Sequence, residues 1–371
     1  MSVQQKIEKT GKHKLLALDG GGIRGMLTLE ILAKIELLLQ EKLGRENDFV
    51  LSDYFDYIAG TSTGAIIAAC LSRGMRVDEI RKFYEESGTA MFDKASLLKR
   101  FRYTYESEAL TNKLQEVFGS DTKLGDENLK TLLLLVLRNA TTDSPWPVSN
   151  NPNAKYNLMT RTDSNLLFPL WQLVRASTAA PTYFPPESIL VGNNNFIFVD
   201  GGVTMYNNPS FQLFLMATVE PYALQWPTGE DQMLLVSIGT GSAANANADL
   251  ATDEMNLLYN ATSIPSALMY AASNEQDFLC RVFGQCRHGD ELDREVGNMC
   301  NVKGPTDNKL FSYVRYNANL SRKGLDELGL LQIKPEQVQK MDSVQFMDKL
   351  QIVGKTVADV KVKIDHFEGF L

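Results

Sequence analysis

The chain contains few cysteines, and their spacing does not suggest a disulfide-rich fold. Four cysteines occur among 371 residues and none forms a C-x-x-C pair, so a disulfide framework is not expected in a chain of this length. Three of them stand near one histidine in the sequence, which leaves a zinc site as an alternative: Cys280, Cys286, His288 and Cys300. Their spacing matches no common zinc-ligand pattern, and we expect free thiols instead.

Long apolar segments are also missing. The longest purely apolar run, residues 65–71, is far shorter than the roughly 20 residues that cross a bilayer. The first ten residues are polar and of mixed charge, without the apolar stretch of a secretion signal. We therefore expect a cytosolic protein.

The chain has no excess of positive charge. Acidic residues outnumber basic residues by 45 to 37, which gives a net charge of −8. This charge argues against DNA or RNA as a partner and provides no overall attraction to anionic membranes. The content of 44% hydrophobic and 22% charged residues is that of an ordinary globular protein, long enough for one large domain or two.

The most informative stretch is residues 57–69, where an apolar and aromatic run ends in Gly-Thr-Ser-Thr-Gly and an Ala/Ile-rich run follows. This pattern predicts a strand, a sharp turn and a helix. A serine in such a turn has a strained backbone and needs small residues two positions away on each side, which Gly60 and Gly64 provide. The hydroxyl of Ser62 would then lie near the positive end of a helix, as in a nucleophile elbow. A glycine-rich turn without a catalytic role is the alternative.

A glycine-rich loop follows the first predicted strand, at residues 14–19, and precedes an amphipathic helix that reaches about residue 43. The loop contains Gly20, Gly21, Gly22, Ile23, Arg24 and Gly25. Its G-x-G-x-x-G spacing also occurs in dinucleotide-binding folds. There, however, the next strand ends in an acidic ribose ligand, whereas here it ends at Ser62. We favour a loop that offers backbone N–H groups, with Arg24 nearby, to an oxyanion.

The scarcity of histidine limits the choice of a base for Ser62. Histidine usually has this role in serine hydrolases, but the chain contains only His13, His288 and His366. His13 lies in the polar lead-in and His366 near the end, so His288 is the candidate for a triad. The alternative is Asp200, which follows a predicted strand and would take the serine proton directly. Such a dyad relies strongly on stabilisation of the oxyanion.

The other predicted elements alternate between strands and helices. Strands are expected at residues 54–59, 132–137, 156–160, 196–199, 233–238 and 311–316. Helices are expected at residues 77–87, 108–118, 169–177 and 210–219, and amphipathic helices from residues 321 and 335 onward. The proline-containing stretch 141–153 is interpreted as a surface excursion.

Two further segments each permit two interpretations. Residues 91–105 combine four cations with aromatic side chains, which suits either a membrane interface or a solvated loop-helix junction. Residues 179–186 contain three prolines and must be non-helical. Their apolar character suits either the wall of an acyl pocket or ordinary loop packing.

Four motifs together resemble the patatin-like phospholipase family. They are Asp-Gly-Gly-Gly-Ile-Arg-Gly at 19–25, Gly-Thr-Ser-Thr-Gly at 60–64, Ala-Ala-Pro-Thr-Tyr-Phe-Pro-Pro at 179–186 and Asp-Gly-Gly at 200–202. They occur in the order of that family, and the resemblance is strong over about residues 12–241. It implies an α/β fold of three layers, in which helices flank a central, mainly parallel sheet. It further implies a patatin-like domain over residues 12–320, and we expect a helical extension over residues 321–371 to pack on the same domain.

The resemblance also implies a Ser-Asp dyad without a catalytic histidine or a metal ion, in which Ser62 is the nucleophile and Asp200 the base. The implied oxyanion hole comprises Gly20, Gly21, Gly22, Arg24 and Gly25. The glycines with a structural role in the motifs are Gly60, Gly64, Gly201 and Gly202. The implied activity is hydrolysis of phospholipid acyl esters, by a cytoplasmic enzyme that associates peripherally with the inner face of the membrane.

Longer matches at residues 177–184, 199–209 and 236–241 are most similar to bacterial patatin-like effectors of anti-phage defence, which a cyclic nucleotide activates. This similarity implies a cyclic nucleotide as activator and no other cofactor. The sequence shows no recognisable motif for binding a cyclic nucleotide. The candidate contacts lie in its C-terminal part, and the alternative is that they are ordinary surface residues: Arg315, Tyr316, Arg322 and Lys323. The alternative function is a constitutive lipid acyl hydrolase of general metabolism, and the formation of a homo-oligomer stays open.

Overall fold

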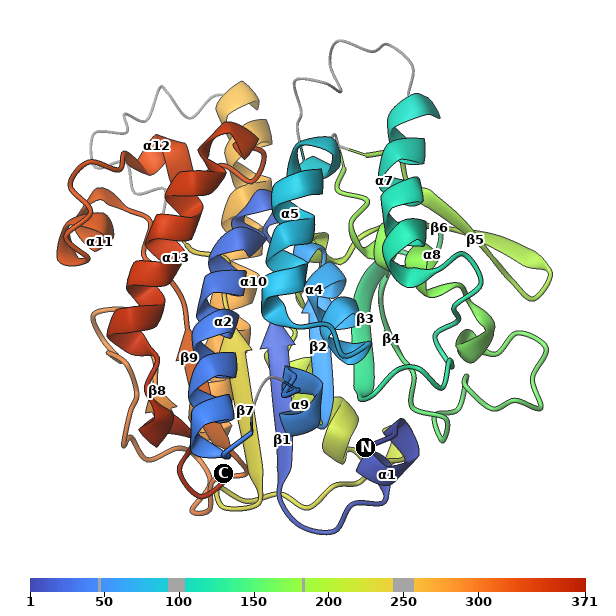
Figure 1. The fold of residues 1–371 in the computed structure, drawn as a ribbon, viewed down its shortest axis with the longest axis horizontal. Coiled ribbons are helices and arrows are strands. Elements are labelled where there is room, and N and C mark those ends of the chain that lie inside the picture. The colour runs from blue at the N-terminus through green and yellow to red at the C-terminus, as the bar shows by residue number, and fades with distance from the viewer. Residues whose placement is uncertain (46–47, 93–103, 182–183, 243–256) are drawn as a thin grey trace.

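The computed structural model describes residues 1–45, 48–92, 104–181, 184–242 and 257–371. A central sheet runs through the molecule and helices cover both of its faces (Figure 1). The sheet has nine strands in the order β5-β6-β3-β2-β1-β7-β9-β8, and β4 also pairs with β3. The predicted three-layer α/β architecture is thereby confirmed.

Most of the sheet is parallel. The strands of this part are β1 (His13–Leu18), β2 (Tyr57–Thr61), β3 (Leu132–Asn139), β7 (Met233–Ile238), β8 (Gln285–His288) and β9 (Ser312–Tyr316). Three antiparallel strands complete the other end: β4 (Ser144–Ser149), β5 (Glu187–Val191) and β6 (Asn194–Asp200). Because parallel strands end at the same edge of a sheet, the loops after β1, β2 and β7 meet there.

Each face of the sheet has its own apolar core. In β1, for example, Leu16 and Leu18 belong to one core and Leu15 and Ala17 to the other. The first core includes α2 (Gly25–Lys42), α4 (Thr63–Ser72), α5 (Val77–Phe92), α7 (Thr104–Phe118), α8 (Leu170–Ser177) and α13 (Met347–Lys361). The second includes α9 (Ser210–Thr218) and α10 (Leu257–Phe283). Burial on both faces explains why the central strands read as continuous apolar runs.

The C-terminal part returns to the N-terminal half of the chain, where α13 lies along α2 (Figure 1). The two helices approach closely at Gly354, where a Cβ atom would be 2.9 Å from the Cα atom of Leu27.

The shorter helices are α1 (Val3–Ile7), α3 (Leu51–Tyr54), α11 (Arg322–Glu327) and α12 (Pro335–Val338). The domain boundary near residue 320 stays a prediction. No helix in the described ranges is long and apolar enough to cross a membrane.

Several predicted elements differ from the structure. Residues 141–153 are not only a surface excursion, because β4 lies within them and pairs with β3. Its Pro145 and Pro147 concealed this strand, although prolines are tolerated at a sheet edge. The strand predicted at residues 156–160 is wrong, since these residues form turns. The short strands β5 and β8 were not predicted.

Candidate active site

Ser62 lies at the turn between β2 and α4, as the sequence predicts. Its φ of 54° and ψ of −122° place a non-glycine residue in a strained backbone conformation. The flanking glycines are needed for space. A Cβ atom at Gly60 would lie 2.1 Å from the carbonyl oxygen of Gly64, and one at Gly64 would lie 2.3 Å from that of Leu18. Only glycine therefore lets β1, β2 and α4 approach one another this closely.

The hydroxyl of Ser62 donates a hydrogen bond of 2.6 Å to Oδ2 of Asp200. The other carboxylate oxygen, Oδ1, accepts a hydrogen bond of 2.6 Å from the backbone N–H of Gly202. Burial raises the pKa of Asp200 to about 6, against the opposing effect of these two hydrogen bonds. At neutral pH the group is thus mostly ionised, and it is a stronger base than an exposed aspartate. Gly201 is required by close packing, because a Cβ atom there would lie 2.2 Å from the carbonyl oxygen of Val136.

The pairing of β6 with β3 explains how Asp200 reaches Ser62. Because β6 is antiparallel to β3, its last residue would normally lie at the opposite edge of the sheet from the end of β2. However, β6 pairs only with the last three residues of β3, on the side where β2 stops. Val136 pairs with Thr61, and the next residue, Leu137, pairs with Asp200. The carboxylate is therefore held directly beyond the end of β2.

The glycine-rich loop after β1 lies against the nucleophile turn. A Cβ atom on Gly20 would be 3.3 Å from the Cβ atom of Ser62 and 2.4 Å from Oδ1 of Asn207. The carbonyl oxygen of Gly20 accepts a hydrogen bond of 2.8 Å from Thr240 Oγ1. A Cβ atom on Gly21 would lie 2.1 Å from the same hydroxyl oxygen. The loop is thus held from the end of β7 at a position that excludes larger residues.

Some backbone N–H groups of this loop already have acceptors, which reduces the set of donors available to the predicted oxyanion hole. Those of Gly20, Arg24 and Gly25 already donate to carbonyl oxygens. Among the residues that the structure describes, the N–H groups of Gly21 and Gly22 have no hydrogen-bond acceptor. Arg24 directs its Nε atom to the carbonyl oxygen of Gly21, at 3.4 Å. The predicted oxyanion hole therefore keeps two backbone donors, the N–H groups of Gly21 and Gly22. Arg24 instead supports the loop.

In the described part of the chain, no histidine contacts Ser62. His13 stacks on the indole of Trp226, with ring centroids 3.9 Å apart. His288 and His366 stack on each other, with centroids 4.7 Å apart. The geometry therefore favours the aspartate over His288 as the proton acceptor of the serine.

The sequence model of the patatin-like phospholipase family matches residues 16–214, which is more than half of the chain. The chain belongs to the patatin-like phospholipase family. The matched span of this patatin-like chain contains the glycine-rich loop, Ser62 and Asp200.

The relatives of this patatin-like chain include bacterial and plant proteins. A cGAMP-activated phospholipase from Vibrio cholerae is 29% identical over 239 residues, which cover 61% of this chain and 64% of the relative. A cGAMP-activated phospholipase from Escherichia coli is 30% identical over 241 residues, which cover 61% of this chain and 62% of the relative. Patatin-T5 from Solanum tuberosum is 29% identical over 260 residues, which cover 65% of this chain and 63% of the relative. The chain thus matches less than two thirds of the length of these relatives.

One residue at the nucleophile turn of this patatin-like chain was missed by the sequence analysis. The backbone N–H of Ser62 donates to Ser177 Oγ at 3.0 Å, and this hydroxyl donates to the carbonyl oxygen of Val136 at 2.6 Å. Ser177, the last residue of α8, therefore links the strained turn to β3. It lies 115 positions from Ser62 in the sequence, so no local pattern could reveal the contact.

A buried ion pair supports the glycine-rich loop and was also missed. Asp19, which precedes the loop, accepts two hydrogen bonds from the guanidinium of Arg315, at 2.8 and 2.5 Å. Both side chains are buried. Arg315 also donates to Ser237 Oγ at 2.7 Å. The pair thus connects the start of the loop to β7 and β9.

We expect Arg315→Met to destabilise the fold by about 3 to 5 kcal/mol, because it leaves the Asp19 carboxylate buried and without its counter-ion. Urea unfolding followed by circular dichroism measures this loss. The double variant Asp19→Asn with Arg315→Met should recover part of the stability, and Arg294→Met at an exposed position is the matched control. Equal stability of Arg315→Met and this control would contradict the assigned support of the loop.

The ion pair also changes the set of residues considered for a nucleotide. Arg315 and Tyr316 are buried, so neither offers a surface contact. Arg322 donates to the carbonyl oxygens of two neighbouring residues, Leu330 and Ile333. Lys323 alone of the four candidates is highly exposed, at 84%.

Two expectations lie partly outside the described residues. The basic and aromatic stretch 91–105 falls mostly within residues 93–103, which the structure does not describe. Residues 182–183, also outside the described residues, interrupt the segment 179–186.

In the ranges that are described, no group of three or more His, Cys, Asp or Glu side chains is placed to hold a metal ion. Cys280, one member of the considered zinc site, instead donates to Ser210 Oγ at 3.3 Å.

Proposed function

We propose that this chain is a serine acyl-ester hydrolase that cleaves the acyl esters of membrane phospholipids. The observation that carries the proposal is the 2.6 Å hydrogen bond from Ser62 Oγ to Asp200 Oδ2 at a strained strand-helix turn. The family match supports a phospholipid as the substrate class. Because the net charge is −8, attachment to the inner face of an anionic membrane would be local and peripheral.

In the proposed reaction, Asp200 takes the proton of Ser62 while Oγ attacks the ester carbonyl. The N–H groups of Gly21 and Gly22 stabilise the negative charge that forms on the carbonyl oxygen. Protonated Asp200 then gives its proton to the leaving lysophospholipid oxygen, and the acyl group remains on Ser62. Asp200 next activates a water molecule, which releases the fatty acid and restores the serine.

The raised pKa of Asp200 predicts how activity depends on pH. The carboxylate is the active form, so protonation removes the base. Because burial raises the pKa of Asp200 to about 6, kcat/KM should be level above about pH 7 and fall about tenfold per pH unit well below pH 6. Hydrolysis of a soluble p-nitrophenyl ester between about pH 4.5 and 8 tests this profile without changes in a lipid surface. A level profile over this range would contradict the assignment of the base.

We further propose that a cyclic nucleotide activates the hydrolase in bacterial antiviral defence. The support is that relatives from Vibrio cholerae and Escherichia coli are named cGAMP-activated phospholipases. The competing proposal is a constitutive lipid acyl hydrolase of general metabolism, which the similarity to a plant patatin favours.

Hydrolysis of a fluorogenic phospholipid by the purified chain tests both proposals. The assay is run without nucleotide and with a panel of cyclic di- and trinucleotides, and His288→Ala serves as a variant outside the proposed dyad. Activity with only one of these nucleotides would support gating. Equal activity with and without them would leave the hydrolase standing and overturn activation. Absence of hydrolysis under every condition would overturn the phospholipase proposal.

A further inference from the structure

Two cysteines outside the proposed active site lie side by side. The Sγ atoms of Cys286 and Cys300 are 3.5 Å apart, although the residues are separated by 14 positions in the sequence. Both are free thiols. Cys286 lies on β8, the last strand at its end of the sheet, and Cys300 lies in the loop that follows. Since an S–S bond is about 2.05 Å long, the sulfur atoms need to approach by about 1.5 Å to form one.

We propose that Cys286 and Cys300 form a reversible disulfide bond when the protein meets a hydroperoxide. The two thiols are accessible in different degrees, which assigns them different roles. Cys300 is partly exposed and Cys286 is buried. Both line an open cavity of about 440 Å³, through which a small peroxide can reach Cys300.

The reaction proceeds in two steps that balance. The thiolate of Cys300 attacks one oxygen of the hydroperoxide, the O–O bond breaks, and a sulfenic acid forms, while the leaving alkoxide or hydroxide takes a proton from solvent and departs as an alcohol or water. The sulfur of Cys286 then attacks Sγ of Cys300, and the S–O bond breaks. The leaving hydroxide takes the proton of the Cys286 thiol and departs as water. The two thiols together lose two electrons, which the hydroperoxide gains.

Burial raises the pKa of the Cys286 thiol, which suits this order of events. A thiol that stays protonated reacts poorly with peroxide itself. It can still react with a sulfenic acid held next to it, because its proton is transferred to the leaving hydroxide. Cys300 is therefore the residue that is oxidised first and Cys286 the one that resolves it.

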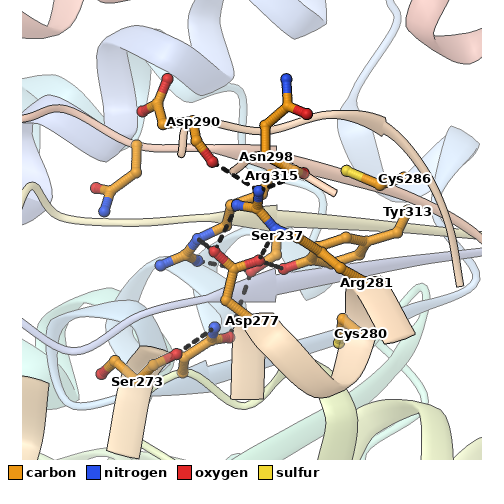
Figure 2. Close-up of polar contacts among 12 residues, drawn as sticks. Ser237, Ser273, Asp277, Cys280, Arg281, Cys286, Asp290, Asn298, Tyr313 and Arg315 are labelled. Atoms are coloured by element: carbon orange, nitrogen blue, oxygen red, sulfur yellow. Dashed lines mark hydrogen bonds and ion pairs between the residues drawn. The ribbon is translucent and has the colours of Figure 1, made fainter. Parts of the chain in front are cut away.

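Arg281 holds together two parts of the segment between the two cysteines. Its Nη1 atom donates to the carbonyl oxygens of Asp290 and Asn298, at 2.6 and 2.8 Å. Figure 2 shows this guanidinium between the two residues, with Cys286 nearby. These two carbonyl groups lie within the segment that a disulfide between Cys286 and Cys300 would close. The bond therefore joins parts of the chain that native contacts already bring together, and large movements are not needed.

The same arginine connects this segment to the core of the protein. Arg281 pairs with Asp277 through two hydrogen bonds, of 2.8 and 2.7 Å. Asp277 accepts a further hydrogen bond of 3.0 Å from the hydroxyl of Tyr313 on β9 (Figure 2). The proposed disulfide would therefore form in a segment that Arg281 and Asp277 anchor to β9 through buried hydrogen bonds. The alternative is that the thiols are merely neighbours that pack as small apolar groups.

The test uses the full reduced chain treated with a small excess of hydrogen peroxide. Thiols that remain are alkylated under denaturing conditions, and the protein is digested with trypsin without reduction. Trypsin is expected to place Cys286 in peptide 282–287 and Cys300 in peptide 295–303. Mass spectrometry should then find these two peptides joined, with a mass two hydrogen atoms below their sum. The count of free thiols should fall from four per chain to about two, and dithiothreitol should restore it.

Two variants make the experiment decisive. Cys300→Ser should lose the joined peptide, whereas Cys70→Ala, which removes a buried thiol elsewhere, should retain it. If both peptides are recovered separately and alkylated after treatment, the two thiols are neighbours only and the proposal is wrong. Conversion of Cys300 to a sulfinic acid without the joined peptide would also overturn it.

Discussion

Ser62→Ala should reduce hydrolysis of a fluorogenic phospholipid at least about 10³-fold, measured as kcat/KM with the most active form of the protein. The hydroxyl is the only group of the serine that can bond to the acyl carbon, and alanine fits the same turn without new contacts. The loss should therefore appear in kcat. A fluorophosphonate probe should label the wild-type chain at residue 62 and leave the variant unlabelled.

The matched control is Ser72→Ala in α4, the helix that follows the turn. Ser72 is buried, and its hydroxyl has no hydrogen-bond partner among the described residues. Its loss removes a similar atom without touching the proposed chemistry, so activity should stay within about twofold of wild type. Retention of substantial hydrolysis by Ser62→Ala would refute the nucleophile assignment.

Asp200→Asn should lower kcat by about 10² to 10⁴-fold and leave the fold intact. Asparagine has nearly the same shape, and its carbonyl oxygen can still accept the hydrogen bond from Gly202. Its amide cannot accept the proton of Ser62, so the nucleophile loses its base. Thermal unfolding of the variant should match wild type within a few degrees.

A purely structural role for Asp200 would give a different set of results. The variant would then lose stability together with activity, and its residual activity would keep the wild-type pH profile. If Asp200 is the base, the decrease in rate below pH 6 should disappear in Asp200→Asn. Asp307→Asn, at an exposed position, is the control and should behave as wild type in both measurements.

The central sheet and the nucleophile turn could be predicted because their signals are local. The strands at residues 14–19 and 233–238 are short apolar runs, and the turn at Ser62 is marked by two glycines that no other residue can replace there. The strand β4 was hidden by Pro145 and Pro147, which normally mark a loop. β8 is only four residues long, too short to show a periodic pattern.

The support of the site was not predictable, because it comes from pairs of residues far apart in the chain. Asp19 and Arg315 are 296 positions apart, and each alone reads as an ordinary charged residue. The same limit applies to Gly20, whose N–H was predicted to face an oxyanion. The sequence contains the glycine but does not show that the carbonyl oxygen of Asn207 accepts this N–H.

The shared pairing of β2 and β6 with β3 has a consequence for redesign of this protein. Ser62 and Asp200 are separated by 138 positions in the sequence, yet the backbone hydrogen bonds of one strand fix the distance between them. The length of the loops in the intervening segment therefore does not set this distance. Insertion of one residue into β6 would be far more harmful, because a slip of register turns the aspartate to the opposite face of the sheet.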